Sequence, residues 1–374
     1  MRTLTQQEAE DILYGACIYG TGGGGDLKEG LRIISEIYSN GIQVRIVSLE
    51  DVEKDWLIAS PYYVGSVASP KKEIAEKLEN LPKSKENVSV LAAKSLQNAL
   101  GKKLDAVIAT ELGANIAWAM ETAAFLNIPL VDADPAGRAV PDIAHTTFNI
   151  FDIPIAPFAL ANKYGDVLIV QSVANHGRAE DIARNFAISS GNIAGMCDHP
   201  ISGERLMSTV IRDTLTNSER VGQARRLANE QDSSPINPIC EAGKGRILIK
   251  GTVTSSNWKD VTGFIEGDIT ITSLDGNDCL SLWFRNEHMV ARNDAGIVSI
   301  IPELITVVNL KDGHPILNPN CKEGLEVAVI TYPAPKPWES EKGLAIFGPE
   351  YIGEDRAVYS QLKSLEEFSH TKQA

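Results

Sequence analysis

The stretch AVIATELGANIAWAMETAAFLNIPLVDADPAGR, residues 106–138, decides the fold. Its apolar run at 106–109 predicts a buried strand, residues 115–126 predict a helix, and residues 128–131 lead into a second strand. Strand, helix and strand in this order are typical of a parallel βαβ unit. Because ligands of such sheets bind beyond the carboxyl ends of the strands, the loop that follows each strand is a candidate site loop.

The residues before this unit predict two helices joined by glycines. Thr5, with Glu8 three residues later, has the pattern of a capping box, so residues 4–20 predict a helix. Four consecutive glycines follow, and a second helix is expected near 26–39. We therefore expect residues 1–166 to form a three-layer α/β domain with a mostly parallel sheet.

The residues after this unit change in character. Residues 167–360 are expected to form a second domain, with a helical part at 177–232 and a β-rich part at 243–335. Short β-rich runs separated by Gly, Asp and Asn in the latter part favour a barrel-like subdomain. The tail, 361–374, predicts a polar helix that frays.

Composition restricts the class of partner. The 374 residues carry 35 basic and 49 acidic side chains, a net charge of −14, which argues against nucleic acid and anionic membranes as partners. No apolar stretch has the length of a membrane helix, and no signal peptide is visible. Five scattered cysteines fit a reducing cytoplasm. We expect a cytoplasmic protein with a small-molecule ligand, and a homo-oligomer is plausible for a chain of this size.

The glycine run is a candidate binding loop. Backbone amides of Gly23, Gly24 and Gly25, at the start of a helix, are suited to an anionic group such as a carboxylate. The alternative is a tight structural turn in which Asp26 caps the next helix. A Walker loop is excluded because no Gly-Lys-Ser/Thr sequence follows.

Acidic residues follow the second strand of the βαβ unit. Asp132, Asp134 and Asp142 provide carboxylates for a metal ion or for acid–base chemistry, and Arg138 lies between them. The alternative is a buried network in which Arg138 neutralises its acidic neighbours.

Three further places carry polar candidates. Glu111 and Asn115 follow the first strand of the unit, and His199 offers an imidazole, a common zinc ligand. The alternative for His199 is a loop residue with a satisfied ring. We interpret residues 285–288 (RNEH) as a solvated turn, with a position facing an interdomain cleft as the alternative.

Taken in order, these motifs resemble the S-methyl-thiohydantoin desulfurase-like family, and the resemblance covers about residues 6–355. The motifs that carry it are GGGGD at 22–26, ELGAN at 111–115, DADPAGRAVPD at 132–142, HPISG at 199–203, FRNE at 284–287, IPELI at 301–305 and GP at 348–349.

The resemblance implies a two-domain hydrolase that uses a metal, with zinc as the expected ion. Water would replace the sulfur substituent of an S-methylated thiohydantoin or a similar small cyclic amide or thioamide. The expected roles are metal binding by Asp132, Asp134 and His199, proton transfer by Glu111 or Asp142, stabilisation of negative charge by Arg138, and substrate binding by Gly23, Gly24, Gly25, Asp26 and Asn115. The alternative is a non-catalytic ligand-binding or accessory subunit, because members are often found with hydantoinase- and oxoprolinase-type enzymes.

Overall fold

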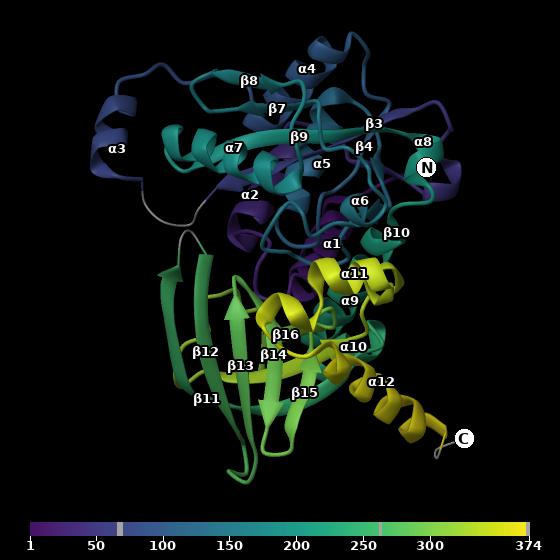
Figure 1. The fold of residues 1–374 in the computed structure, drawn as a ribbon, viewed down its shortest axis with the longest axis vertical. Coiled ribbons are helices and arrows are strands. Elements are labelled where there is room, and N and C mark those ends of the chain that lie inside the picture. Colours follow the sequence, from purple (N-terminus) through teal and green to yellow (C-terminus); the bar gives the residue numbers. More distant parts are fainter. Residues whose placement is uncertain (66–69, 262–263, 372–374) are drawn as a thin grey trace.

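The N-terminal half of the molecule is organised around an eight-stranded mixed sheet (Figure 1). The computed structural model describes residues 1–65, 70–261 and 264–371. The strand order is β1-β2-β5-β4-β3-β9-β7-β8, in which β2, β5, β4 and β3 are parallel and the other pairings are antiparallel. The strands are β1 (Arg2–Thr3), β2 (Arg45–Val47), β3 (Leu57–Gly65), β4 (Ala106–Val107), β5 (Leu130–Val131), β7 (Phe158–Ala161), β8 (Val167–Val170) and β9 (Ile193–Ser202).

Helices cover both faces of this sheet, as expected for three layers. Alternate residues of a strand face opposite layers: Val107 packs in one apolar cluster, whereas Ala106 packs in another together with Phe148. One layer contains α1 (Gln6–Tyr19), α2 (Leu27–Ser39), α4 (Val88–Leu100) and α5 (Ile116–Leu126); the other contains α6 (Thr147–Ile150), α7 (His176–Ser189) and α8 (Gly203–Leu206). A short helix, α3 (Lys72–Leu78), has no buried residue.

Strand β9 is the main departure from the expected elements. We predicted helix throughout 177–232, yet residues 193–202 form a strand that pairs with β3 and β7. It is buried over most of its length because it lies between these two strands, so its apolar run lacks the one-sided pattern that marks a surface helix. The strand follows the expected domain boundary at residue 166 and still belongs to the N-terminal sheet.

Helix α9 (Thr214–Glu230) connects the two halves by packing closely on α1. The contact requires glycine on both helices. A Cβ atom at Gly15 would lie 1.8 Å from the carbonyl oxygen of Ser218, and one at Gly222 would lie 1.9 Å from the carbonyl oxygen of Asp11. The backbones can approach this closely because the residue that faces the partner's carbonyl group is glycine in each case.

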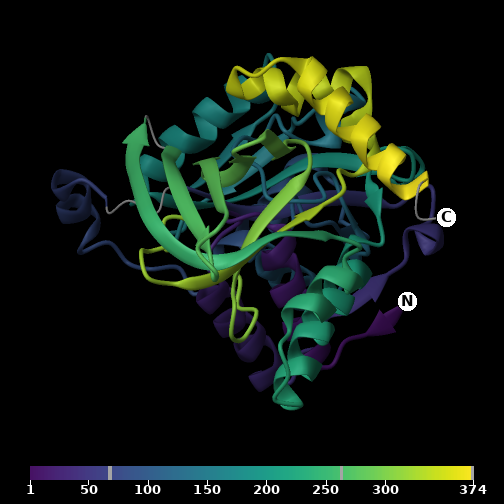
Figure 2. The same ribbon diagram turned by 90° about the horizontal axis from the view of Figure 1, so that it is seen from below.

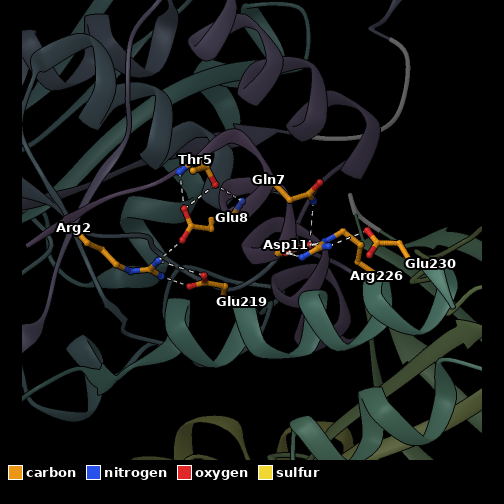
Figure 3. Close-up of polar contacts among 8 residues, drawn as sticks. All are labelled: Arg2, Thr5, Gln7, Glu8, Asp11, Glu219, Arg226 and Glu230. Atoms are coloured by element: carbon orange, nitrogen blue, oxygen red, sulfur yellow. Dashed lines mark hydrogen bonds and ion pairs between the residues drawn. The ribbon is translucent and has the colours of Figure 1, made fainter.

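Polar contacts flank the same helix pair (Figure 3). The buried Asp11 carboxylate accepts hydrogen bonds from Arg226, at 2.9 Å from both Nε and Nη2. At the other end of the contact Arg2 bridges Glu8 of α1 and Glu219 of α9. The capping box predicted at Thr5 and Glu8 is confirmed.

The C-terminal half contains a seven-stranded antiparallel sheet, and Figure 2 shows it curled into a half-barrel. Its order is β15-β14-β13-β12-β11-β17-β16, and apolar side chains such as Val253, Leu282 and Val329 fill its interior. This confirms the expected barrel-like subdomain. The strands are β11 (Arg246–Val261), β12 (Phe264–Ser273), β13 (Cys279–Arg285), β14 (Glu287–Asn293), β15 (Gly296–Ile300), β16 (Leu304–Asn309) and β17 (Glu326–Tyr332).

The remaining elements are short except for the last helix. They are the two-stranded sheet of β6 (Ala133–Asp134) and β10 (Ile211–Arg212), helices α10 (Ile236–Ala242), α11 (Glu341–Phe347) and α12 (Arg356–Thr371), and 3-10 turns at Leu49–Asp51, Lys336–Glu339 and Pro349–Ile352. The tail predicted as helix falls within α12, apart from residues 372–374, which lie outside the described residues. Among described helices, none combines the length and apolarity needed to cross a membrane.

Candidate functional site

A cleft of about 910 Å³ opens where the N-terminal sheet meets the half-barrel. Its lining comes from segments that are far apart in the sequence. They are the turn between α1 and α2 that contains residues 22–25 (the glycine turn), the end of β3, the loops after β4 and β5, the β13–β14 turn and residues 317–320. The loops after β4 and β5 follow the two strands of the predicted βαβ unit, where the sequence predicted candidate site loops. Both halves of the chain therefore contribute to one site.

The glycine turn lies against two other segments of this cleft. Gly24 is at φ +79°, and a Cβ atom there would be 2.8 Å from the α-carbon of Gly113. The Gly24 carbonyl accepts a hydrogen bond of 2.7 Å from the amide of Asn115, and Asp26 caps α2 through the amide of Lys28. The turn thus fixes the loop after β4 in place. The capping role that was the alternative for Asp26 is present, and its role in substrate binding stays a prediction.

Glu111 is a buried carboxyl group at the carboxyl end of β4. It is 8% exposed, and its two oxygens accept hydrogen bonds of 2.9 Å from Asn115 Nδ2 and from the amide of Val140. Burial raises its pKa to about 7 despite these hydrogen bonds. At neutral pH the group is therefore divided between its acidic and basic forms, as a catalytic acid–base residue requires.

Glu287 is a second buried carboxyl group, contributed by the half-barrel. It is 3% exposed, lines the cleft, and its Oε2 has no hydrogen-bond partner among the described residues. Burial is the main cause that raises its pKa well above the usual value, and the charge of Glu111 adds to it. Our interpretation of residues 285–288 as a solvated turn was wrong for Glu287 and for His288, which is fully buried.

The turn that carries Glu287 is attached to the glycine turn by backbone hydrogen bonds. The amide of His288 donates to the Thr21 carbonyl and the amide of Asn318 donates to the Gly22 carbonyl, both at 2.8 Å. Asn318 Nδ2 also donates to the carbonyl of Asn286, a residue at φ +57°. The position of Glu287 therefore depends on tertiary contacts rather than on its own strand.

Arg138 lies behind the two carboxyl groups and does not line the cleft. Its guanidinium is completely buried, donates to the Glu303 carbonyl at 2.9 Å and to Thr21 Oγ1 at 3.0 Å, and stacks on Phe347. Its charge lowers the pKa of Glu287, against the effects of burial and Glu111. This geometry agrees with the alternative of a buried network, and the role of Arg138 in stabilising substrate charge stays a prediction.

Asp142 lines the cleft beside an ion pair. Its Oδ1 accepts a hydrogen bond of 2.7 Å from the amide of Ala144, and burial raises its pKa. Glu180 of α7 pairs with Arg184 and accepts a hydrogen bond from the amide of Ile143. These side chains form one wall of the cleft.

Two of the expected metal ligands are engaged within the fold. Asp132 Oδ1 accepts hydrogen bonds from the amides of Leu215 and Thr216, and its Oδ2 accepts one from Thr216 Oγ1, so it caps the start of α9. Asp134 Oδ1 accepts from the amides of Ala136 and Gly137, whereas its Oδ2 has no partner among the described residues. Burial raises the pKa of Asp134 to about 6.

The third expected ligand, His199, belongs to a chain of polar side chains. Its Nδ1 is 2.8 Å from Asp198 Oδ1, and its Nε2 is 3.1 Å from Nε2 of His176. Asp198 Oδ2 in turn accepts a hydrogen bond of 2.6 Å from the hydroxyl of Tyr62, which lines the cleft. Both ring nitrogens of His199 therefore already have partners.

These contacts decide how well the expected ligands fit a metal ion. Within residues 1–65, 70–261 and 264–371 no group of three or more His, Cys, Asp or Glu side chains is arranged to bind one. Asp132, Asp134 and His199 contact different segments, and in this arrangement they do not fit a shared metal. Zinc stays a prediction from the resemblance.

The cleft brings together seven of the residues proposed from the sequence, namely Gly23, Gly24, Gly25, Asp26, Glu111, Asn115 and Asp142. Arg138, Asp132, Asp134 and His199 lie outside its lining. Sequence reasoning assigned no role to Thr146 or His176 and misplaced Glu287. The signal for Glu287 was present, because a Glu-His pair lies between two apolar strand runs.

An α/β domain joined to a half-barrel, with buried carboxyl groups in the cleft between them, defines the class of protein. Two family models described as S-Me-THD-like match this chain. The model of the N-terminal domain matches residues 7–172, and the model of the C-terminal domain matches residues 174–361. The chain belongs to the S-Me-THD-like family, as the motifs indicated.

Solved structures support the fold alone. A crystal structure of a protein from Chromobacterium violaceum, a structural genomics target, is similar with a TM-score of 0.77 and 22% identity. The similarity covers 94% of this chain and 97% of that one. The search of curated proteins finds no match.

Proposed function

We propose that this protein hydrolyses a small cyclic thioamide or amide of the S-methyl-thiohydantoin type, with Glu111 and Glu287 as the acid–base pair. The observation that carries the proposal is the presence of two buried carboxyl groups with raised pKa values in one cleft. Membership of the S-Me-THD-like family supports the choice of substrate class.

The environments of the two groups suggest different roles. Glu111 has a pKa of about 7 and serves as the base. Burial and the charge of Glu111 raise the pKa of Glu287 well above its usual value, so Glu287 begins protonated and serves as the acid. Two like charges in a buried site disfavour ionisation of both groups, so one proton on the pair is the expected resting state.

The one proton shared by Glu111 and Glu287 is sufficient for both steps of the hydrolysis. Glu111 removes a proton from water as the oxygen bonds to the ring carbon between the two nitrogens, and Glu287 protonates the ring nitrogen that receives the electron pair. In the second step Glu287 removes the hydroxyl proton as the carbonyl forms. The carbon–sulfur bond breaks, and Glu111 gives its proton to the departing sulfur. The products are a hydantoin and methanethiol, and both carboxyl groups return to their starting states.

The test is release of methanethiol from S-methyl-thiohydantoin by the full-length chain, measured with a thiol reagent, with and without added zinc. We expect turnover that Glu111→Gln and Glu287→Gln each reduce by at least about 100-fold. Asp278→Asn, an exposed acid in the β12–β13 turn, is the control and should retain full activity. Binding without turnover under both metal conditions would favour the accessory-subunit alternative.

A further inference from the structure

The cleft is strongly acidic. Among the lining residues that the structure describes, seven have carboxyl groups and two, Lys163 and Arg184, have basic side chains. Arg184 is already paired with Glu180, and Lys163 is solvent-exposed. Among the described residues the cation that acts on Glu111 and Glu287 is Arg138, which lies outside the lining of the cleft. Arg138 behind Glu111 and Glu287 offsets part of their charge, but carboxyl groups outnumber basic side chains in the lining, so the cleft favours a cationic over an anionic ligand.

Two buried side-chain oxygens in the same cleft, one carboxyl and one hydroxyl, have no hydrogen-bond partner among the described residues. Glu287 Oε2 and Thr146 Oγ1 belong to side chains that are 3% exposed, and neither atom is hydrogen-bonded within the described part of the chain. Both residues line the cleft. Buried polar atoms are normally paired, so these two are places where a ligand with N–H donors gains hydrogen bonds without displacing existing ones.

Aromatic rings complete the lining on the N-terminal side. Tyr63 and Trp118 both line the cleft, with ring centroids 4.0 Å apart in an edge-to-face arrangement. The face of an indole or a phenol attracts a cation. The carboxyl groups, the unpaired acceptor oxygens and the aromatic rings therefore all favour a ligand with positive charge and N–H donors.

We propose that the cleft binds its ligand as a cation, specifically a small ring with a protonated N–C–N group that donates its N–H bonds to Glu287 and Glu111. This inference rests on the proposed function and names the charge state of its substrate class. A protonated ring facing two carboxylates has the same proton count as a neutral ring facing one protonated carboxyl group. Binding as a cation thus corresponds to transfer of the Glu287 proton to the ring nitrogen.

Binding of a cation should change the number of protons held by Glu111 and Glu287, and this change can be measured. Arg138, Asp134 and Glu180 act on the charges of Glu111 and Glu287. The hydroxyl groups of Tyr62 and Tyr351 also interact with Glu111 and Glu287, respectively. A cation stabilises both carboxylates, so a ligand that arrives protonated displaces the proton of the pair into the solvent. The affinity for a ligand that stays protonated over this range should therefore rise as pH increases from about 6 to about 8.

The experiment compares three five-membered rings by calorimetry on the full-length protein. The probes are 2-(methylthio)-2-imidazoline as the cation, hydantoin as the neutral ring and hydantoin-5-acetate as the anion. We expect the cation to bind at least about tenfold more tightly than the other two and to release protons on binding. Its affinity should also fall between about 50 mM and about 500 mM NaCl.

Variants identify the group responsible. Glu287→Gln should weaken binding of the cation by about tenfold or more and change binding of hydantoin by less than about threefold. Asp278→Asn, outside the cleft, should change neither. If Glu287→Gln does not fold, as judged by circular dichroism, Asp142→Asn at the half-buried wall of the cleft replaces it, with a smaller loss expected in the same direction.

The inference is overturned if the neutral or anionic ring binds as tightly as the cation, if no probe binds, or if folded Glu287→Gln retains the affinity for the cation. These outcomes are separate from the failure of the proposed function. Preference for the cation without release of methanethiol would remove the hydrolase proposal alone. Turnover without a charge preference would remove this inference alone.

Discussion

The carboxyl group of Glu287 occupies the space that a side chain at Gly23 would need. A Cβ atom at Gly23 would lie 1.9 Å from Glu287 Oε1 and 2.6 Å from its carboxyl carbon. Glycine at this position therefore permits a carboxyl group from the half-barrel to reach the turn between α1 and α2. At this contact the absence of a side chain in the glycine turn leaves the room that the Glu287 carboxyl group fills.

Replacing Gly23 by alanine should consequently displace Glu287. We expect Gly23→Ala to reduce kcat/KM for methanethiol release by about 100-fold, a loss that a displacement of about 1 Å can cause. Gly177→Ala is the matched control, because the one described atom within 4 Å of a Cβ atom there is Asn175 Oδ1, at an ordinary contact distance of 3.5 Å. Equal activities of the two variants would show that the contact has no catalytic importance.

The rate should depend on pH through Glu111. Because burial raises its pKa to about 7, the fraction that acts as a base increases as pH rises through that value. We expect kcat/KM to rise about tenfold per pH unit below about pH 6 and to level above about pH 8. A profile that is flat over this range would contradict the assignment of Glu111 as the base.

The same group should make stability depend on pH. The folded pKa of Glu111 is raised from 4.5 to about 7, so its stabilising contribution is complete below the unfolded pKa and is lost as pH rises through the folded pKa. The loss is roughly 3 kcal/mol by about pH 8, from roughly 1.4 kcal/mol per pKa unit.

Glu111→Gln removes this loss because glutamine does not ionise. We expect the variant to gain free energy of unfolding, relative to the natural chain, when pH is raised from about 5 to about 8. Urea unfolding at the two pH values measures the difference, with Asp278→Asn as the exposed control. A variant that is equally destabilised at both values would argue against a raised pKa in the folded state.

Asp132 should behave as a helix cap. Its carboxylate accepts the amide hydrogens of Leu215 and Thr216, so Asp132→Ala should lower the free energy of unfolding by about 1–2 kcal/mol. Asp132→Asn retains an acceptor oxygen and should lose less. Elemental analysis of the same preparations tests the other role: loss of a stoichiometric metal in Asp132→Ala, with stability unchanged, would support a ligand instead.

The contact between α1 and α9 should be intolerant of any side chain. Gly222→Ala places a Cβ atom against the backbone of Asp11, and we expect a loss of at least about 2 kcal/mol in the free energy of unfolding. The exposed neighbour Gln223→Ala is the control and should change stability by less than about 0.5 kcal/mol. Thermal unfolding of both variants would measure the difference, and similar melting temperatures would contradict this packing.

Elements defined by nearby residues were predictable from the sequence. The Thr5–Glu8 capping box, the Asp26 cap and the βαβ unit depend on residues within a few positions of one another, and all three are present. The rule for strand ends then placed Glu111 and Asn115 at the cleft without any tertiary information. Strand β9 was missed because a strand buried between two others loses the alternation that identifies it.

The environment of each site residue was decided only by the tertiary structure. The Gly23–Glu287 contact joins segments from opposite halves of the chain. The raised pKa of Glu287 follows from burial and from the charge of Glu111, neither of which leaves a local pattern in the sequence. Asp132 lies in an acidic motif that suits a metal, yet its oxygens accept the amides of α9. The sequence by itself determined which residue types could carry chemistry and which strand ends present them. Packing between distant segments determined which of those residues are buried, paired or open to a ligand, because desolvation and charge interactions depend on distance in space.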